Sequence, residues 1–135
     1  MVKHILAIDD VEEDFHKILK WAIEFKRLWK ESDEVAMNFF PLDSLAVGSI
    51  YEKPSTRTRV SFEVGINRLG GYPLTLLKND IQLGKSETVG DTSQVLSRFL
   101  GAMTYRCYAH ADVEELAKYA TVPVINALSD KHHPC

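Results

Sequence analysis

Residues 45–59 have the sequence LAVGSIYEKPSTRTR, which holds a strand, a loop and the start of a helix. Residues 45–51 are few and apolar, which predicts a buried strand. A helix is predicted over residues 56–69, because Ser55 is a good N-cap residue and the glycine pair at residues 70–71 is a typical helix stop. A strand followed directly by a helix is the unit from which parallel sheets are built.

The same alternation continues along the chain. Three more strands are predicted, over residues 72–77, 102–108 and 122–128. Two more helices are predicted over residues 89–99 and 112–119, and two polar loops over residues 78–87 and 129–135. Asp112 and Glu115 have the spacing of a capping-box variant. We therefore predict an α/β fold, a parallel sheet of about four strands with helices on both faces in three αβα layers, as one domain over residues 1–135.

An amphipathic helix is predicted before the first strand, over residues 10–30, with Asp10 as its cap and Glu13 three residues further on. Its apolar residues recur every three or four positions and form one stripe. We interpret this stripe, together with Trp21, as core or interface and not as a cofactor site. The stripe consists of Val11, Phe15, Ile18, Ala22, Phe25 and Trp29.

Size and composition restrict the possible functions. The chain has 135 residues, of which 45% are hydrophobic and 26% charged, as expected for one packed domain. A net charge of -3 gives no general attraction to nucleic acid or to an anionic membrane, so an anion site would have to be local. No apolar run approaches the roughly 20 residues of a membrane span. Two cysteines and no signal peptide favour a cytoplasmic setting.

Parallel sheets bind ligands at the carboxyl ends of their strands, which directs attention first to residues 52–59. Ser55, Thr56 and Thr58 are interleaved there with Arg57 and Arg59 around the predicted start of a helix. Free backbone amides, hydroxyls and guanidinium groups together form a phosphate cradle. The alternative is an ordinary serine-capped helix with surface arginines, and this stretch alone leaves both interpretations open.

Arg106 falls late in the strand predicted over residues 102–108. Arginine is seldom buried without a partner, so in a central strand it would need an anion. In an edge strand it would simply point into solvent, and the residue taken alone favours that alternative.

The chain ends with His132, His133, Pro134 and Cys135. These residues fit a metal site, a hydrogen-bond donor to a carbonyl oxygen, or a solvated loop end. Structural zinc needs four ligands, and Cys107 and His110 do not have a recognisable ligand spacing. We therefore expect no metal, no cofactor and two free thiols.

Several segments together resemble a known family. Residues 55–63, STRTRVSFE, resemble the carbamoyl-phosphate motif of aspartate and ornithine carbamoyltransferases. Residues 80–84, DIQLG, and the closing HPC at residues 133–135 are similar to the ornithine branch. Similar segments also occur at residues 91–92, 95–98, 122–126 and 129–130.

The resemblance implies a two-domain trimeric enzyme that transfers the carbamoyl group to the side-chain amine of ornithine, giving citrulline and phosphate without a cofactor. This chain would be the first domain, and the amino-acid-binding domain would be absent from it. The resemblance implies that the phosphate contacts Ser55, Thr56, Arg57, Thr58 and Arg106, and that the carbonyl oxygen contacts Arg57, Thr58, Arg106 and His133. It also implies that the carbamoyl amine lies against Pro134 and Cys135. Gln82 would come from a neighbouring subunit.

Two alternatives remain at this point. One is another transcarbamylase, acting on putrescine, aspartate or N-acetylornithine, because the first domain binds only carbamoyl phosphate. The other is a non-catalytic anion-binding or assembly module. The sequence also departs from the family pattern at residues 85–86, Lys-Ser, and at Gly90, where alanine is common and glycine is expected to weaken the helix start.

Overall fold

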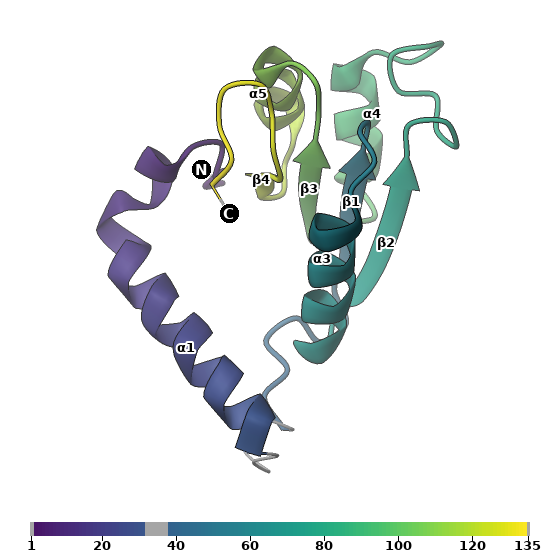
Figure 1. The fold of residues 1–135 in the computed structure, drawn as a ribbon. Helices are drawn as coiled ribbons and strands as arrows, with labels where there is room; N and C mark the ends of the chain where they lie inside the picture. Colours follow the sequence, from purple (N-terminus) through teal and green to yellow (C-terminus); the bar gives the residue numbers. More distant parts are fainter. Residues whose placement is uncertain (1, 32–37, 135) are drawn as a thin grey trace.

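The computed structural model describes residues 2–31 and 38–134 (Figure 1). The chain begins with a 3-10 helix, η1, and a long helix, α1, and then alternates strands with helices. The elements in chain order are η1 Ile8–Asp14, α1 Phe15–Glu31, β1 Ala46–Tyr51, α3 Thr56–Arg68, β2 Tyr72–Leu77, α4 Val89–Leu96, β3 Ala102–Arg106, α5 His110–Tyr119 and β4 Val124–Asn126. Within the described residues, no helix has both the length and the apolar character needed to cross a membrane.

The four strands form one parallel sheet in the order β2-β1-β3-β4. Helix α3 covers one face of the sheet, while α4 and α5 cover the other (Figure 1). On the α3 face, the Thr75 hydroxyl of β2 donates a hydrogen bond to the Glu63 carboxylate of α3. The predicted α/β fold with helices on both faces is therefore confirmed.

The hydrophobic core lies between the sheet and the α4–α5 layer. Gly48 allows the side chain of Leu100, just after α4, to approach the backbone of β1 closely. Every second residue of β1 and β3 faces this layer, because side chains alternate between the faces of a strand. The fully buried core side chains include Ile50, Met103, Tyr105, Val113, Leu116 and Val124.

The first helix differs from the prediction in its start and in its burial. Asp10 does not cap an α-helix; its carboxylate accepts hydrogen bonds from the amides of Leu6, at 2.7 Å, and Ala7, at 2.9 Å, and fixes the start of η1. Helix α1 lies apart from the sheet (Figure 1), and none of its residues is buried. Of the predicted stripe, only Val11 of η1 is buried, so the stripe does not belong to the core of this chain.

The start of α5 also differs from the prediction. The helix begins at His110, without a side-chain cap from Ala109, and Asp112 and Glu115 do not form the predicted box. The Asp130 carboxylate instead accepts a hydrogen bond from the amide of His110, at 2.7 Å. The cap therefore comes from a loop that is distant in sequence.

Gly90 has a packing role that its helix propensity does not show. A Cβ atom at Gly90 would lie 2.9 Å from the Tyr119 ring, so glycine allows α4 to pack against the end of α5. The expectation of a merely weakened helix start thus leaves out the contact that the residue makes possible.

Strands β3 and β4 and helix α4 are shorter than predicted, and β4 ends just before Leu128, whose φ is 130°.

Candidate anion-binding site

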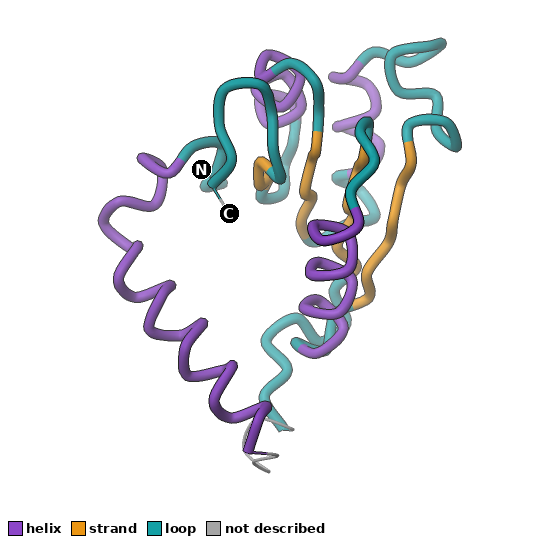
Figure 2. The backbone as a smooth tube through the Cα atoms, in the orientation of Figure 1, coloured by secondary structure: helices purple, strands orange, loops and turns teal. Residues whose placement is uncertain are grey.

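A cleft of about 360 Å³ lies where the loops after β1 and β4 meet the end of β3. Figure 2 shows these loops at one end of the sheet. Parallel strands bring their carboxyl ends to the same edge, which explains why segments far apart in sequence meet here. The cleft is lined by Pro54, Ser55, Thr56, Arg57, Thr58, Arg106, Leu128 and His133.

The N-terminus of α3 forms one wall of this cleft. Ser55 has an extended backbone and is the N-cap residue, and its Oγ accepts a hydrogen bond from the Thr58 amide at 3.3 Å. The predicted cap is confirmed. The first amides of a helix have no intrahelical partner and carry the positive end of the helix dipole, so this wall attracts anions.

Arg106 forms the wall opposite α3. It ends β3, which lies between β1 and β4, so the edge-strand interpretation is wrong. One guanidinium nitrogen, Nη1, donates a hydrogen bond to the Thr58 hydroxyl at 3.3 Å. The Nε atom is buried and has no hydrogen-bond partner among the described residues. A buried donor in this state is costly, and an anion in the cleft would provide an acceptor.

His133 reaches the cleft on a loop that a polar network holds in place. The Asn126 side chain accepts a hydrogen bond from the Leu128 amide, at 3.0 Å, and donates one to the His132 carbonyl, at 3.1 Å. The Ser129 amide also donates to the His132 carbonyl, at 3.0 Å. These bonds fold the loop into a tight turn, and this turn brings both Leu128 and His133 to the cleft.

The other predicted site residues do not line this cleft. Gln82 is exposed on the loop after β2, and its side-chain oxygen accepts a hydrogen bond from the Ser86 hydroxyl at 3.3 Å. Pro134 is half-buried next to His133, and Cys135 lies outside the described residues. His132 packs its ring against that of His110, with 4.9 Å between the centroids. Residues 2–31 and 38–134 contain no group of three metal-ligating side chains.

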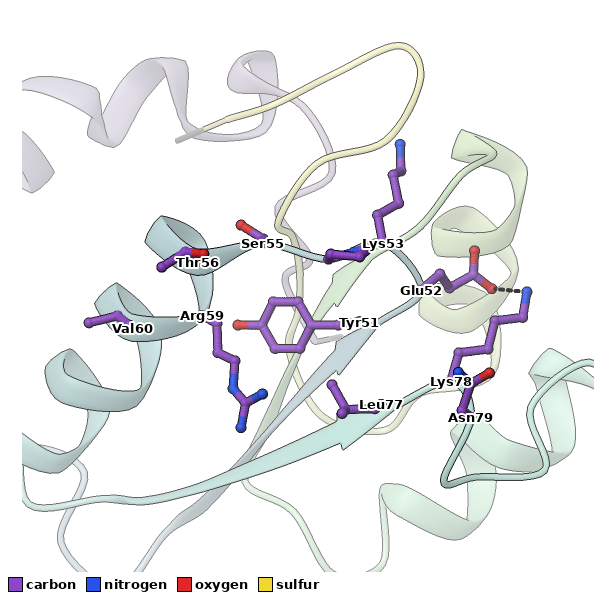
Figure 3. A pocket seen from close by; sticks show the side chains of 11 residues that line it. Tyr51, Glu52, Lys53, Ser55, Thr56, Arg59, Val60, Leu77, Lys78 and Asn79 are labelled. Carbon is purple, nitrogen blue, oxygen red and sulfur yellow. Dashed lines mark hydrogen bonds and ion pairs between the residues drawn. The ribbon is translucent and has the colours of Figure 1, made fainter.

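A second cleft, of about 490 Å³ (Figure 3), shares Pro54, Ser55 and Thr56 with the first. Tyr51 and Arg59 border one part of it, and the Glu52–Lys78 ion pair, with 2.9 Å between Oε1 and Nζ, borders another. Burial alone would raise the pKa of Glu52, but its hydrogen bonds, the one from Lys78 above all, hold this pKa below its usual value.

Sequence reasoning missed Glu52 and Leu128. Glu52 directly follows a strand, at the end where parallel sheets bind ligands, and this position could have marked it. No local pattern distinguishes Leu128, because its positive φ arises from the turn around Asn126.

Known proteins resemble this chain over nearly its whole length. It is 50% identical over 134 residues to an ornithine carbamoyltransferase of Caldicellulosiruptor saccharolyticus. This alignment covers 98% of this chain and 42% of the relative. The ornithine carbamoyltransferase structure from Pyrococcus furiosus matches with a TM-score of 0.91 and 47% identity, over 98% of this chain and 42% of that one. The corresponding Burkholderia thailandensis structure matches with a TM-score of 0.90 and 36% identity, over 99% and 45%.

This chain thus spans less than half the length of these relatives. A family model also matches it, from residue 3 to residue 135, and this model describes the aspartate/ornithine carbamoyltransferase carbamoyl-P binding domain. Together with a cleft between a helix N-terminus and Arg106, this match shows that the chain belongs to the family of carbamoyl-phosphate-binding domains of aspartate and ornithine carbamoyltransferases.

Proposed function

We propose that this chain binds carbamoyl phosphate as the first domain of an ornithine carbamoyltransferase. The observation that carries the proposal is the buried Nε of Arg106, which has no partner among the described residues and lies at a cleft facing the N-terminus of α3. In this proposal the phosphate contacts Ser55, Thr56, Arg57, Thr58 and Arg106, and His133 reaches the carbonyl oxygen.

The proposed chemistry is acyl transfer from phosphate to an amine. The neutral amine of ornithine attacks the carbamoyl carbon, and negative charge develops on the former carbonyl oxygen. Arg57, Thr58, Arg106 and His133 stabilise this charge as an oxyanion hole does. The carbon–oxygen bond to phosphate then breaks, the nitrogen loses a proton, and citrulline and phosphate result. Holding both substrates in one cleft supplies the orientation.

The amine and its binding site lie outside this chain in our proposal. The names of the relatives and the DIQLG and HPC segments support ornithine over aspartate, putrescine or N-acetylornithine. A second domain would hold the ornithine. Gln82 is exposed and does not line the cleft, which supports its contribution to the site of a neighbouring copy in a trimer. We also propose a cytoplasmic location, from the low cysteine content of the sequence.

The binding step can be tested by calorimetric titration with carbamoyl phosphate and with inorganic phosphate. Arg57→Ala and Arg106→Ala should each weaken binding about tenfold or more, since a charged hydrogen bond contributes about 1.5–3 kcal/mol. Arg98→Ala is the matched control, because Arg98 is exposed and follows α4, on the other face of the sheet. Unchanged affinity in both site variants would refute the assignment.

The division of labour between domains has a separate test. The chain alone should fold, as measured by circular dichroism, and form no citrulline from ornithine and carbamoyl phosphate. Positioning of two reactants contributes effective molarities of about 10⁵–10⁸ M, and in our proposal this chain positions only one of them. Turnover within a few orders of magnitude of a full-length enzyme would place the amine site in this half.

A further inference from the structure

Among the described ion pairs, Glu52 provides the most deeply buried carboxylate. Glu52 does not line the proposed anion cleft. Its side chain is 4% exposed, whereas the side chain of its partner Lys78 is 40% exposed. A buried carboxylate is costly unless hydrogen bonds compensate it, so its contacts indicate what the charge does there.

The contacts of Glu52 join the ends of three strands. Its Oε1 accepts hydrogen bonds from Lys78 Nζ, just after β2, at 2.9 Å and from the Tyr105 hydroxyl of β3 at 3.0 Å. Its Oε2 accepts one from the amide of Tyr108, just after β3, at 3.0 Å. The Glu52 amide donates to the carbonyl of Arg106 at 2.9 Å. Glu52 itself begins the loop that leads from β1 to the N-terminus of α3.

The carboxylate and the anion cleft lie on opposite faces of the sheet. Tyr105 faces the α4–α5 core, while Arg106, the next residue, faces α3 and bonds to Thr58. Figure 3 shows the Glu52 side chain directed toward Lys78, away from Thr56. Glu52 therefore does not touch an anion in the cleft, and any effect on binding passes through the backbone it holds.

We propose that Glu52 is a positioning residue for the anion site, which sets the spacing between the N-terminus of α3 and Arg106. This inference rests on the proposed phosphate site. Glu52 thus acts as a brace. One end of this brace is the loop leading to Ser55, and the other is the segment around Arg106, which the Glu52 carboxylate contacts through the Tyr105 hydroxyl and the Tyr108 amide. Both walls of the cleft are tied to one carboxylate.

The sign of the effect separates positioning from simple electrostatics. Glu52 is an acid near an anion site, so its charge alone opposes anion binding. If Glu52 acted only through its charge, replacing it would tighten phosphate binding. If it only stabilised the fold, replacing it would lower the unfolding temperature and leave the affinity of the folded chain unchanged. Positioning alone predicts weaker binding by the folded chain.

The test is a calorimetric titration of the chain with inorganic phosphate, well below each variant's unfolding temperature. Glu52→Ala should weaken binding about tenfold, and Glu52→Gln, which keeps the shape and one acceptor, should lose less. Tyr105→Phe changes no charge and removes one bond of the brace, so it should weaken binding up to about threefold. Asp14→Asn is the matched control, because Asp14 also pairs with a lysine, Lys3, but lies at the end of η1 and lines neither wall of the cleft.

The outcomes distinguish the two proposals. Weaker binding in the Glu52 variants and in Tyr105→Phe, with Asp14→Asn unchanged, supports positioning. Wild-type or tighter affinity in the folded Glu52 variants overturns it, even if Arg106→Ala abolishes binding. A wild-type chain that does not bind phosphate refutes the proposed function itself. If the Glu52 variants do not fold, Tyr105→Phe decides, and an unchanged affinity there is the contrary result.

Discussion

The two faces of the sheet are built from the same strands but differ in character. Toward α4 and α5, β1 and β3 present Ile50, Met103 and Tyr105, all fully buried. Toward α3, the same strands present polar groups, and their buried atoms without a hydrogen-bond partner among the described residues include Thr104 Oγ1 and Arg106 Nε. Each of these strands thus packs apolar side chains on one face and carries, on the other face, polar groups whose hydrogen bonding is incomplete.

This difference indicates how stability and binding are divided. Apolar burial on the α4–α5 face supplies most of the stabilisation, because burial contributes about 25 cal/mol per Å² of apolar surface. The α3 face gives up some of this stabilisation, since a buried polar group without a partner costs free energy. Substitutions on the two faces should therefore have opposite or separable effects on folding and on binding.

The largest expected effect on stability is that of Leu116→Ala on α5. Leu116 is fully buried in the core, and such a truncation costs about 2–5 kcal/mol through lost burial and the cavity it leaves. Chemical denaturation measures the loss. Val64→Ala on α3 is the control, because Val64 is 42% exposed and should cost far less. Equal losses at the two positions would contradict the division between the faces.

Cys107 tests how well the core face excludes solvent and charge. It is fully buried, and burial raises the pKa of its thiol to about 11. Because the thiolate is the reactive form, labelling at pH 8 should be slower in the folded chain than in the unfolded chain by roughly a hundredfold or more. Labelling is followed by mass spectrometry, with and without denaturant. Rapid modification of native Cys107 would show that this end of β3 opens readily.

Gly90→Ala tests the contact between α4 and α5. The new methyl group would lie 2.9 Å from the Tyr119 ring, so we expect a destabilisation of about 1–3 kcal/mol despite the better helix propensity of alanine. Thermal unfolding measures it. Gly90→Ala in a Tyr119→Ala background is the control, because the clash is then absent and alanine should stabilise. Stabilisation in the wild-type background would mean that the ring moves aside easily.

The smallest expected effect, and one of opposite sign, is that of Thr104→Val. This change removes a buried hydroxyl without a partner and keeps the side-chain shape, so it should stabilise the chain by about 1 kcal/mol. Thr92→Val is the matched control, since the buried Thr92 hydroxyl donates a hydrogen bond to Glu87 at 3.3 Å and its loss should destabilise. Destabilisation by Thr104→Val would indicate that the hydroxyl has a partner in solution.

Local patterns predicted the order of strands and helices and the cap at Ser55, because these depend on the spacing of apolar residues and on a single turn of backbone. They did not predict the cap of α5, which Asp130 supplies from twenty residues away. They also left the stripe of α1 open between core and interface. A helical stripe shows which side is apolar but not what covers it.

The sequence by itself determined the α/β class, the position of the proposed anion-binding motif at residues 55–59 and the family resemblance. Each of these is written in contiguous residues. Only the tertiary structure decided that β3 is central, that Arg106 faces Thr58, and that Glu52 ties three strand ends together. The physical reason is that strand order and register are set by packing between distant segments, and no local propensity encodes which strands become neighbours.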